Sequence, residues 1–402
     1  VIDPMRIRFC LEKAFYLAEH GRPGPVLIDI PSDIQRAEVD AALLKPFTAP
    51  APAGSDDGAD QILAALARCK KPVFLVGNGV KQLGLERGLF QLAEERNIPI
   101  VTTLVCMDAA GTPANLGFIG MDGDPAANRA VHDCDLLITF GARLNFKQTG
   151  SNRAAVAPGA KILRVDCDPG ELAYRLRDED AVCADLRHLV PELIRRKGEI
   201  APFGREWLER CLRGKEGSKR KASPNPAGGG LMRALGLRVP ENTVITVDTG
   251  SHRRWLMSTY QWKPGQQVCQ SAGLASMGYG LPAAIGAFYG SKKPVVSING
   301  DGGIMMNLQE LQTVAREQLP ISVVIFNNRC LGDIMEFQKK IFSKRYFTTT
   351  EGTGYQAADF EGIAKGFHLP YRRVLSPDDF AEVDFSIRTP QLIEVAVPSN
   401  EL

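Results

Sequence analysis

The sequence predicts an α/β protein built from parallel sheets with helices on both faces. Two observations support this fold class. Short runs of β-branched residues alternate with segments of helical periodicity along most of the 402 residues. In addition, the stretch 298–312, INGDGGIMMNLQELQ, runs from an apolar strand through three glycines into a helix. Such a turn requires a sharp bend or a close approach of the backbone to another group.

The composition is that of an ordinary globular protein, with 44% hydrophobic and 23% charged residues, and the length predicts two or three domains. A net charge of +2 gives no reason to expect nucleic acid or an anionic membrane as a partner. No apolar run approaches the roughly 20 residues that span a bilayer. The nine cysteines form no CxxC pair, which favours reduced thiols in a cytoplasmic protein and argues against zinc.

Residues 1–40 are predicted to be the end of an α/β domain. Apolar residues follow helical spacing from Arg6 to His20, and the sequence GRPG then stops the helix. PVLIDIP at 25–31 predicts a short strand. The chain starts at Val1 rather than at Met, so we expect it to be a piece of a longer protein.

A central α/β domain is predicted over residues 60–193, after a Pro/Ala-rich linker at 41–59. Its helices are predicted at 60–70 and 89–97, and its strands at 71–79, 98–104, 134–144 and 160–169. Residues 194–230 turn polar and are predicted to be a second, loop-rich linker. We interpret its basic run as a solvated face rather than a nucleic-acid patch.

The third predicted domain covers residues 231–402. Its strands are predicted at 243–248, 294–300, 321–328 and 391–397. Between the middle two strands, six apolar residues at helical spacing predict one amphipathic helix: Ile304, Met305, Leu308, Leu311, Val314 and Ala315. The segment 294–328 is therefore a predicted βαβ crossover.

The crossover brings two polar side chains to one edge of the sheet. Asp301 follows one strand and Asn328 ends the next, with 24 residues between GDG and NN. Their oxygens suit Mg²⁺, and Gly302 and Gly303 leave backbone N–H groups free for an anion. The alternative to a metal site is a glycine turn in which Asp301 caps the helix. A cap would not explain why the neighbouring strand ends in a pair of asparagines.

GDG followed after 24 residues by NN resembles the cofactor motif of thiamine diphosphate (ThDP) enzymes. Further segments resemble the acetolactate synthase-like branch of that family: QSAGLASMGYGLPAAIGA (270–287), GRPGPVLIDIPSDIQ (21–35), GFIGMDGDPAANRAVHDCDLLITFGARL (117–144) and RVDCDPGEL (164–172). The resemblance implies a central domain followed by a diphosphate-binding domain.

The resemblance also implies roles for individual residues. Mg²⁺ would be held by Asp301, Asn328 and the backbone carbonyl of Cys330. Met277 would wedge under the cofactor, although without the resemblance it would pass for core filler. His252 would contact the cofactor or substrate and is the one candidate catalytic residue in this chain, with a purely structural histidine as the alternative. The implied cofactor-binding residues are Gly250, Ser251, Met277, Gly300, Asp301, Gly302, Gly303 and Asn328.

The implied activity is decarboxylation of a pyruvate-like 2-keto acid with transfer of the two-carbon unit to an acceptor. A homodimer or homotetramer with its active site between subunits is implied as well. The catalytic Glu of the family lies in the pyrimidine-binding domain, of which residues 1–40 are only the end, so no residue here is assigned that role and the chain alone is expected to be inactive. The alternatives are an enzyme that only decarboxylates or uses another acyl donor, and a non-catalytic or split-enzyme chain.

Three departures from the family pattern keep parts of this interpretation open. Phe337 occupies the position where acetolactate synthases carry a tryptophan that helps to choose the acceptor. GARLNF at 141–146 lacks the acidic pair found after GAR in those enzymes. GNG at 77–79 is followed by Gln82, where a dinucleotide fingerprint requires its third glycine. FAD binding by the central domain therefore stays open beside a packing role for these glycines.

Overall fold

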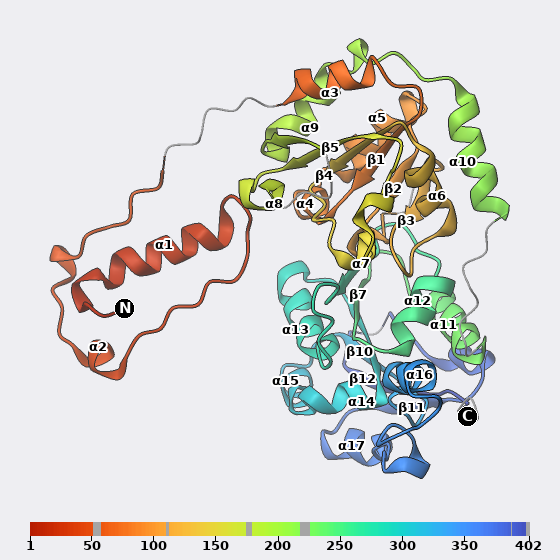
Figure 1. The fold of residues 1–402 in the computed structure, drawn as a ribbon. Helices are drawn as coiled ribbons and strands as arrows, with labels where there is room; N and C mark the ends of the chain where they lie inside the picture. The colour runs from red at the N-terminus through yellow and green to blue at the C-terminus, as the bar shows by residue number, and fades with distance from the viewer. Residues whose placement is uncertain (51–57, 110–111, 174–178, 218–225, 387, 399–402) are drawn as a thin grey trace. The chain divides into compact units, whose positions relative to one another are not determined.

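The computed structural model describes residues 1–50, 58–109, 112–173, 179–217, 226–386 and 388–398. They contain two six-stranded sheets, each with helices on its faces (Figure 1), and divide into two compact units. Every strand pair whose register is known is parallel. The predicted α/β fold class with parallel sheets is thus confirmed. Parts of both predicted linkers, 51–57 and 218–225, lie outside the described residues.

The first sheet has the strand order β3-β2-β1-β4-β5-β6. Its strands are β1 (Pro72–Val76), β2 (Ile100–Thr102), β3 (Asn115–Phe118), β4 (Leu136–Phe140), β5 (Lys161–Asp166) and β6 (Asp180–Cys183). All residues of β1 and β4 are buried, as expected for strands covered on both faces, and these apolar runs were predictable. The edge strands β3 and β6 were missed because they bury only part of their residues.

Helices connect and follow these strands: α3 (Ala59–Leu66), α4 (Asn78–Gln82), α5 (Glu86–Glu95), α6 (Pro125–Asp133), α7 (Phe146–Thr149), α8 (Pro169–Ala173), α9 (Leu186–Arg195) and α10 (Arg205–Gly217). The prediction of a loop-rich linker at 194–230 is wrong where α10 lies. Trp207 is buried, and its indole nitrogen donates to the carbonyl oxygen of Pro72 at 3.0 Å. Because α10 is mostly polar, too few apolar residues recur at helical spacing to predict this helix from the sequence.

The N-terminal segment contains α1 (Ile7–Glu19) and the short α2 (Ser32–Arg36). The helix predicted from Arg6 to His20 is confirmed. The strand predicted at 25–31 is wrong, since these residues join no strand of the described sheets. A strand requires a hydrogen-bonded neighbour, which sequence alone cannot supply. Leu27 in this stretch is 94% exposed, so its apolar side chain is not buried by any part of the described chain.

The second sheet has the strand order β11-β12-β10-β9-β7-β8. Its strands are β7 (Val244–Val247), β8 (Gln267–Gln270), β9 (Val295–Gly300), β10 (Ile321–Asn327), β11 (Tyr371–Val374) and β12 (Gln391–Ala396). The four predicted strands are confirmed as β7, β9, β10 and β12, whereas the edge strands β8 and β11 were missed. The helices of this unit are α11 (Pro226–Arg238), α12 (Ser251–Thr259), α13 (Gly280–Ser291), α14 (Asp301–Ile304), α15 (Leu311–Arg316), α16 (Gly332–Ile341) and α17 (Phe360–Gly366).

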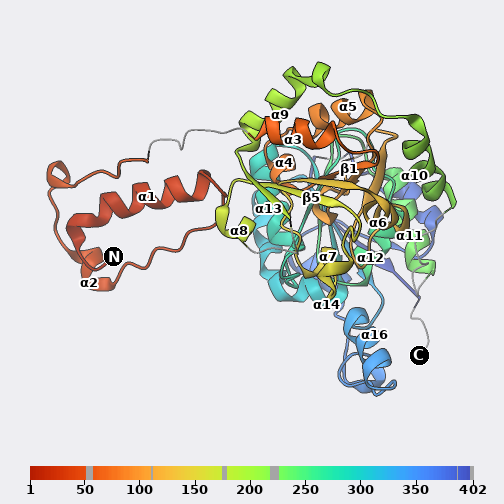
Figure 2. The ribbon, with the colours of Figure 1, turned by 45° about the horizontal axis from the view of Figure 1, so that its top comes forward.

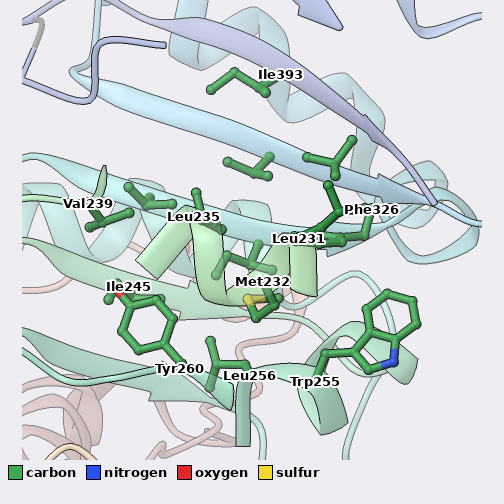
Figure 3. Packing of buried hydrophobic residues seen from close by; sticks show 14 of the residues in the cluster. Leu231, Met232, Leu235, Val239, Ile245, Trp255, Leu256, Tyr260, Phe326 and Ile393 are labelled. Atoms are coloured by element: carbon green, nitrogen blue, oxygen red, sulfur yellow. The ribbon is translucent and has the colours of Figure 1, made fainter. Parts of the chain in front are cut away.

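Alternate residues of the second sheet face two separate cores. Ile298 and Phe326 belong to the core beneath α11 and α12, whereas Val295 and Ile325 belong to the core beneath α13, α15 and α17. Both views place α13 on the opposite side of this sheet from α11 and α12 (Figures 1 and 2). Figure 3 shows the first core gathered around α11. These two layers fix the strand ends that carry the candidate site.

The crossover between β9 and β10 is broken rather than continuous, so the prediction of one amphipathic helix there is wrong. Helix α14 passes into a 3₁₀ segment at Met305–Glu310, and α15 follows. Asn307 has non-helical backbone angles (φ −137°, ψ 34°), and its side chain donates to the carbonyl oxygen of Gly278 at 2.8 Å. Met305, predicted to be on the apolar face, is 44% exposed as a result of the break.

Two further findings concern the chain as a whole. Its nine cysteines all lie within the described residues and are free thiols. Within the same residues, no helix combines the length and apolar character that crossing a membrane would require.

Candidate cofactor and metal site

A pocket opens at the carboxyl ends of β7, β9 and β10, which are neighbours in the second sheet. Its empty volume is about 560 Å³, including the solvent at its mouth. All ten residues singled out from the sequence line it: Gly250, Ser251, His252, Met277, Gly300, Asp301, Gly302, Gly303, Asn328 and Cys330. The structure therefore brings together residues spread over 81 sequence positions, from 250 to 330.

Three oxygen atoms converge at one point of this pocket. The inward-facing end of the Asn328 amide, drawn here as its oxygen, lies 3.1 Å from Oδ1 of Asp301 and 3.0 Å from the carbonyl oxygen of Cys330. The amide nitrogen of Asn328 points the other way and donates to the Cys330 Sγ at 3.1 Å. Rotating the amide by half a turn would convert both oxygen contacts into hydrogen bonds. The amide can adopt either orientation: with its nitrogen inward it hydrogen-bonds both oxygens, and with its oxygen inward it offers a third oxygen to a cation.

The spacing of these oxygens fits a small hard cation. Ligands held about 2.1 Å from Mg²⁺ at right angles lie about 3.0 Å from one another. A carboxylate, an amide and a backbone carbonyl are oxygen ligands of the kind that Mg²⁺ prefers. In the described part of the chain, no cluster of three or more His, Cys, Asp or Glu side chains offers another metal site. The donor set thus fits Mg²⁺ better than zinc.

Asp301 is only 2% exposed, and burial raises the pKa of its carboxyl group to about 7. The hydroxyl of Tyr355 donates to Oδ2 at 3.0 Å and partly opposes this rise in pKa, as do nearby backbone N–H groups. The structure contradicts the alternative of Asp301 as an N-cap, because Gly300 caps α14 and Asp301 is its first residue. A buried carboxylate outside a capping role requires another partner, and a cation would supply one.

Asp248, at the end of β7, holds the loop that carries Met277. It is fully buried and accepts from the backbone N–H groups of Gly278 at 3.0 Å and Tyr279 at 3.1 Å. A Cβ atom on Gly303 would lie 2.3 Å from Oδ2 of Asp248, so this close approach requires glycine. Asp248 was not singled out in the sequence, although it opens the motif DTGSH.

His252 lines the pocket, but its ring is fixed by its own turn. Its Nε2 lies 3.0 Å from the carbonyl oxygen of Asp248, which can only accept, so Nε2 carries the hydrogen. Burial lowers the pKa of His252, against the opposing effect of the Asp248 carboxylate. The imidazole is therefore neutral at pH 7, with Nδ1 as an acceptor.

Ser251 also lines the pocket, at the start of α12. Its hydroxyl donates to Oδ1 of Asp333 at 3.2 Å. Arg254 forms an ion pair with the same carboxylate. This network joins α12 to the start of α16 beside the three converging oxygens.

Comparison with known proteins identifies the family. The model of the thiamine pyrophosphate enzyme central domain matches residues 59–193, and that of the C-terminal TPP binding domain matches residues 248–395. The chain is 34% identical to a probable acetolactate synthase large subunit of Methanocaldococcus jannaschii, over 94% of this chain and 67% of the relative. It belongs to the acetolactate synthase large-subunit family of thiamine pyrophosphate enzymes.

Other members of this family show similar identity. The large subunit of acetolactate synthase isozyme 2 from Escherichia coli is 35% identical over 97% of this chain and 71% of the relative. Chloroplastic acetolactate synthase 1 from Zea mays is 32% identical over all of this chain and 66% of the relative. The chain thus spans about two thirds of its relatives. Every predicted site residue falls within the C-terminal TPP binding domain match.

Proposed function

We propose that the complete protein is a Mg²⁺-dependent ThDP enzyme that decarboxylates a pyruvate-like 2-keto acid and transfers the two-carbon unit to an acceptor. The observation that carries the proposal is the convergence of Asp301, the Asn328 amide and the Cys330 carbonyl in one pocket at the carboxyl ends of β9 and β10. Asp301, Asn328 and the carbonyl of Cys330 would hold Mg²⁺, which would in turn hold the diphosphate. Bound ThDP supplies an electron sink for decarboxylation.

The residues around the metal ligands are suited to binding and orienting the cofactor. The backbone at Gly302 and Gly303 would lie along the diphosphate, with Gly250 and Ser251 opposite. Met277 would press against the cofactor rings. Gly278, the residue after Met277, is held on both sides, because its N–H donates to Asp248 and its carbonyl oxygen accepts from Asn307.

The proposal leaves some roles unassigned in this chain. We assign no residue the part of the catalytic Glu, and neutral His252 acts as a contact rather than as an acid. We propose an active site between the subunits of a homodimer or homotetramer. We assign no FAD-binding residue, since Gly77 has a packing reason of its own: a Cβ there would lie 2.2 Å from the carbonyl oxygen of Gly141.

Product analysis tests the proposal. The complete protein, incubated with pyruvate, Mg²⁺ and ThDP, is expected to form acetolactate. Acetaldehyde as the sole product would instead establish the decarboxylase alternative. ThDP binding without turnover of pyruvate or other 2-keto acids would establish a non-catalytic chain. Loss of product in Asp301→Ala and Asn328→Ala would tie the activity to this pocket.

A further inference from the structure

Tyr355 contacts the candidate metal site from a loop outside the motif. Its hydroxyl donates to Oδ2 of Asp301 at 3.0 Å, and the other carboxylate oxygen, Oδ1, faces Asn328 and the Cys330 carbonyl. We propose that Tyr355 is a positioning residue for the metal site, which fixes the Asp301 carboxylate so that Oδ1 points at the cation. This inference rests on the proposed function and deepens it.

The loop that carries Tyr355 also holds the segment of the third metal ligand. The backbone N–H of Tyr355 donates to the carbonyl oxygen of Thr350 at 3.0 Å. Thr350 forms an antiparallel bridge with Cys330, and the N–H of Leu331 donates to the carbonyl oxygen of Thr349 at 2.9 Å. The same loop therefore holds the Asp301 side chain and the Cys330 backbone at once.

Further contacts stiffen this loop. The hydroxyl of Thr353 accepts from the N–H groups of Thr349 at 3.2 Å and Thr350 at 3.0 Å. Arg329, next to the metal-ligand Asn328, forms an ion pair with Glu351 at 2.5 Å. The Tyr355 hydroxyl is the donor in its contact with Asp301, because an ionised carboxylate oxygen only accepts. A residue held in this way can orient a carboxylate without touching the cation.

The chain offers a matched control in Tyr371 of β11. Its hydroxyl likewise donates to a buried carboxylate, that of Glu394, in the same unit. Tyr371 does not line the pocket. Tyr355→Phe and Tyr371→Phe therefore each remove one hydrogen bond to a buried carboxylate, and only Tyr355 bonds a proposed metal ligand.

The experiment measures the Mg²⁺ concentration that half-saturates ThDP binding by the complete protein. Quenching of tryptophan fluorescence can report binding, because Trp255 lines the pocket. Tyr355→Phe is expected to raise the half-saturating Mg²⁺ concentration about tenfold, as loss of an outer hydrogen-bond partner of a metal ligand does. Saturating Mg²⁺ is expected to restore ThDP binding, and Tyr371→Phe to leave the Mg²⁺ dependence unchanged.

Three results would overturn the inference while leaving the proposed function in place. An unchanged Mg²⁺ dependence in Tyr355→Phe would remove the positioning role, and an equal shift in Tyr371→Phe would reduce it to general destabilisation. A melting temperature without Mg²⁺ that falls far more in Tyr355→Phe than in the control would assign Tyr355 a purely structural role. Failure of the wild-type protein to show Mg²⁺-dependent ThDP binding would instead overturn the proposed function, and this inference with it.

Discussion

At the scale of single residues, Asp301 is the clearest sign of a bound cation. Its carboxyl group is buried and its pKa is raised to about 7, so near neutral pH the metal-free protein either keeps a proton on it or buries a charge. The Asn328 amide and the carbonyl oxygen of Cys330 lie beside this group, and each can present an oxygen to a cation. A divalent cation would compensate the buried charge.

The raised pKa of Asp301 predicts a pH dependence for the metal-free protein. The folded-state pKa of about 7 exceeds the ordinary value of 3.8, so the folded protein binds this proton more tightly than the unfolded chain. The stability contributed by the protonated group is therefore fully present below pH 4 and is lost as the pH rises to 7. Asp301→Asn removes this titration, and its amide can donate to the facing oxygens.

We expect Asp301→Asn to be more stable than the wild type at pH 8 without Mg²⁺, by about 1–3 kcal/mol. The difference should shrink towards zero near pH 4. Urea unfolding at several pH values measures this difference. If the free energies of unfolding of the two proteins changed with pH in parallel, the assignment of Asp301 as a buried carboxylate with a raised pKa would be contradicted.

Gly303 gives a prediction about packing. A Cβ atom there would lie 2.3 Å from the buried carboxylate of Asp248, so Gly303→Ala should lower the free energy of unfolding by about 1–3 kcal/mol. Gly286 on α13 has no atom within 4 Å of its Cβ position, so Gly286→Ala should stabilise by up to about 1 kcal/mol. Chemical denaturation of both variants checks the contrast. Equal effects would show that Gly303 is not tightly packed.

At the scale of elements, the break after α14 links the crossover to the Met277 loop. Asn307→Ala removes the 2.8 Å hydrogen bond to the carbonyl of Gly278, which should cost about 1–2 kcal/mol and loosen residues 276–279. Hydrogen exchange of these amides, followed by mass spectrometry, should speed up. Gln312→Ala, at an exposed position of the following helix α15, should leave their exchange unchanged.

The elements also show which features a sequence can predict. Strands β1, β4, β9 and β10 are buried along nearly their whole length because both of their faces are covered, and their mostly apolar sequences are a local signal of this. The edge strands and α10 bury too few residues to leave such a pattern. The strand predicted at 25–31 has the right composition but no pairing neighbour in the described chain.

The residues of the candidate site likewise divide into those that a local sequence pattern predicts and those whose role depends on distant residues. Asp301 and Asn328 were predictable because the crossover fixes their spacing and parallel strands share an edge. Tyr355 lies 54 positions from Asp301 in an irregular loop, so no periodicity connects the two. Asp248 was hidden because its role depends on backbone N–H groups 30 and 31 positions away.

At the scale of the whole molecule, every residue proposed to bind ThDP or Mg²⁺ lies in the second unit. The family relation explains why that unit carries the pocket, since the C-terminal TPP binding domain match covers all of these residues. The chain spans about two thirds of its relatives. Catalysis by the complete protein is therefore a separate question from cofactor binding by this pocket.

The most direct test is calorimetric titration of the complete protein with ThDP, with and without Mg²⁺. We predict binding that requires Mg²⁺ and is weakened at least about 100-fold in Asp301→Ala and in Asn328→Ala, with Tyr371→Phe as a folded control. ThDP binding that is independent of Mg²⁺, or that survives both substitutions, would contradict the assignment of this pocket as the cofactor site.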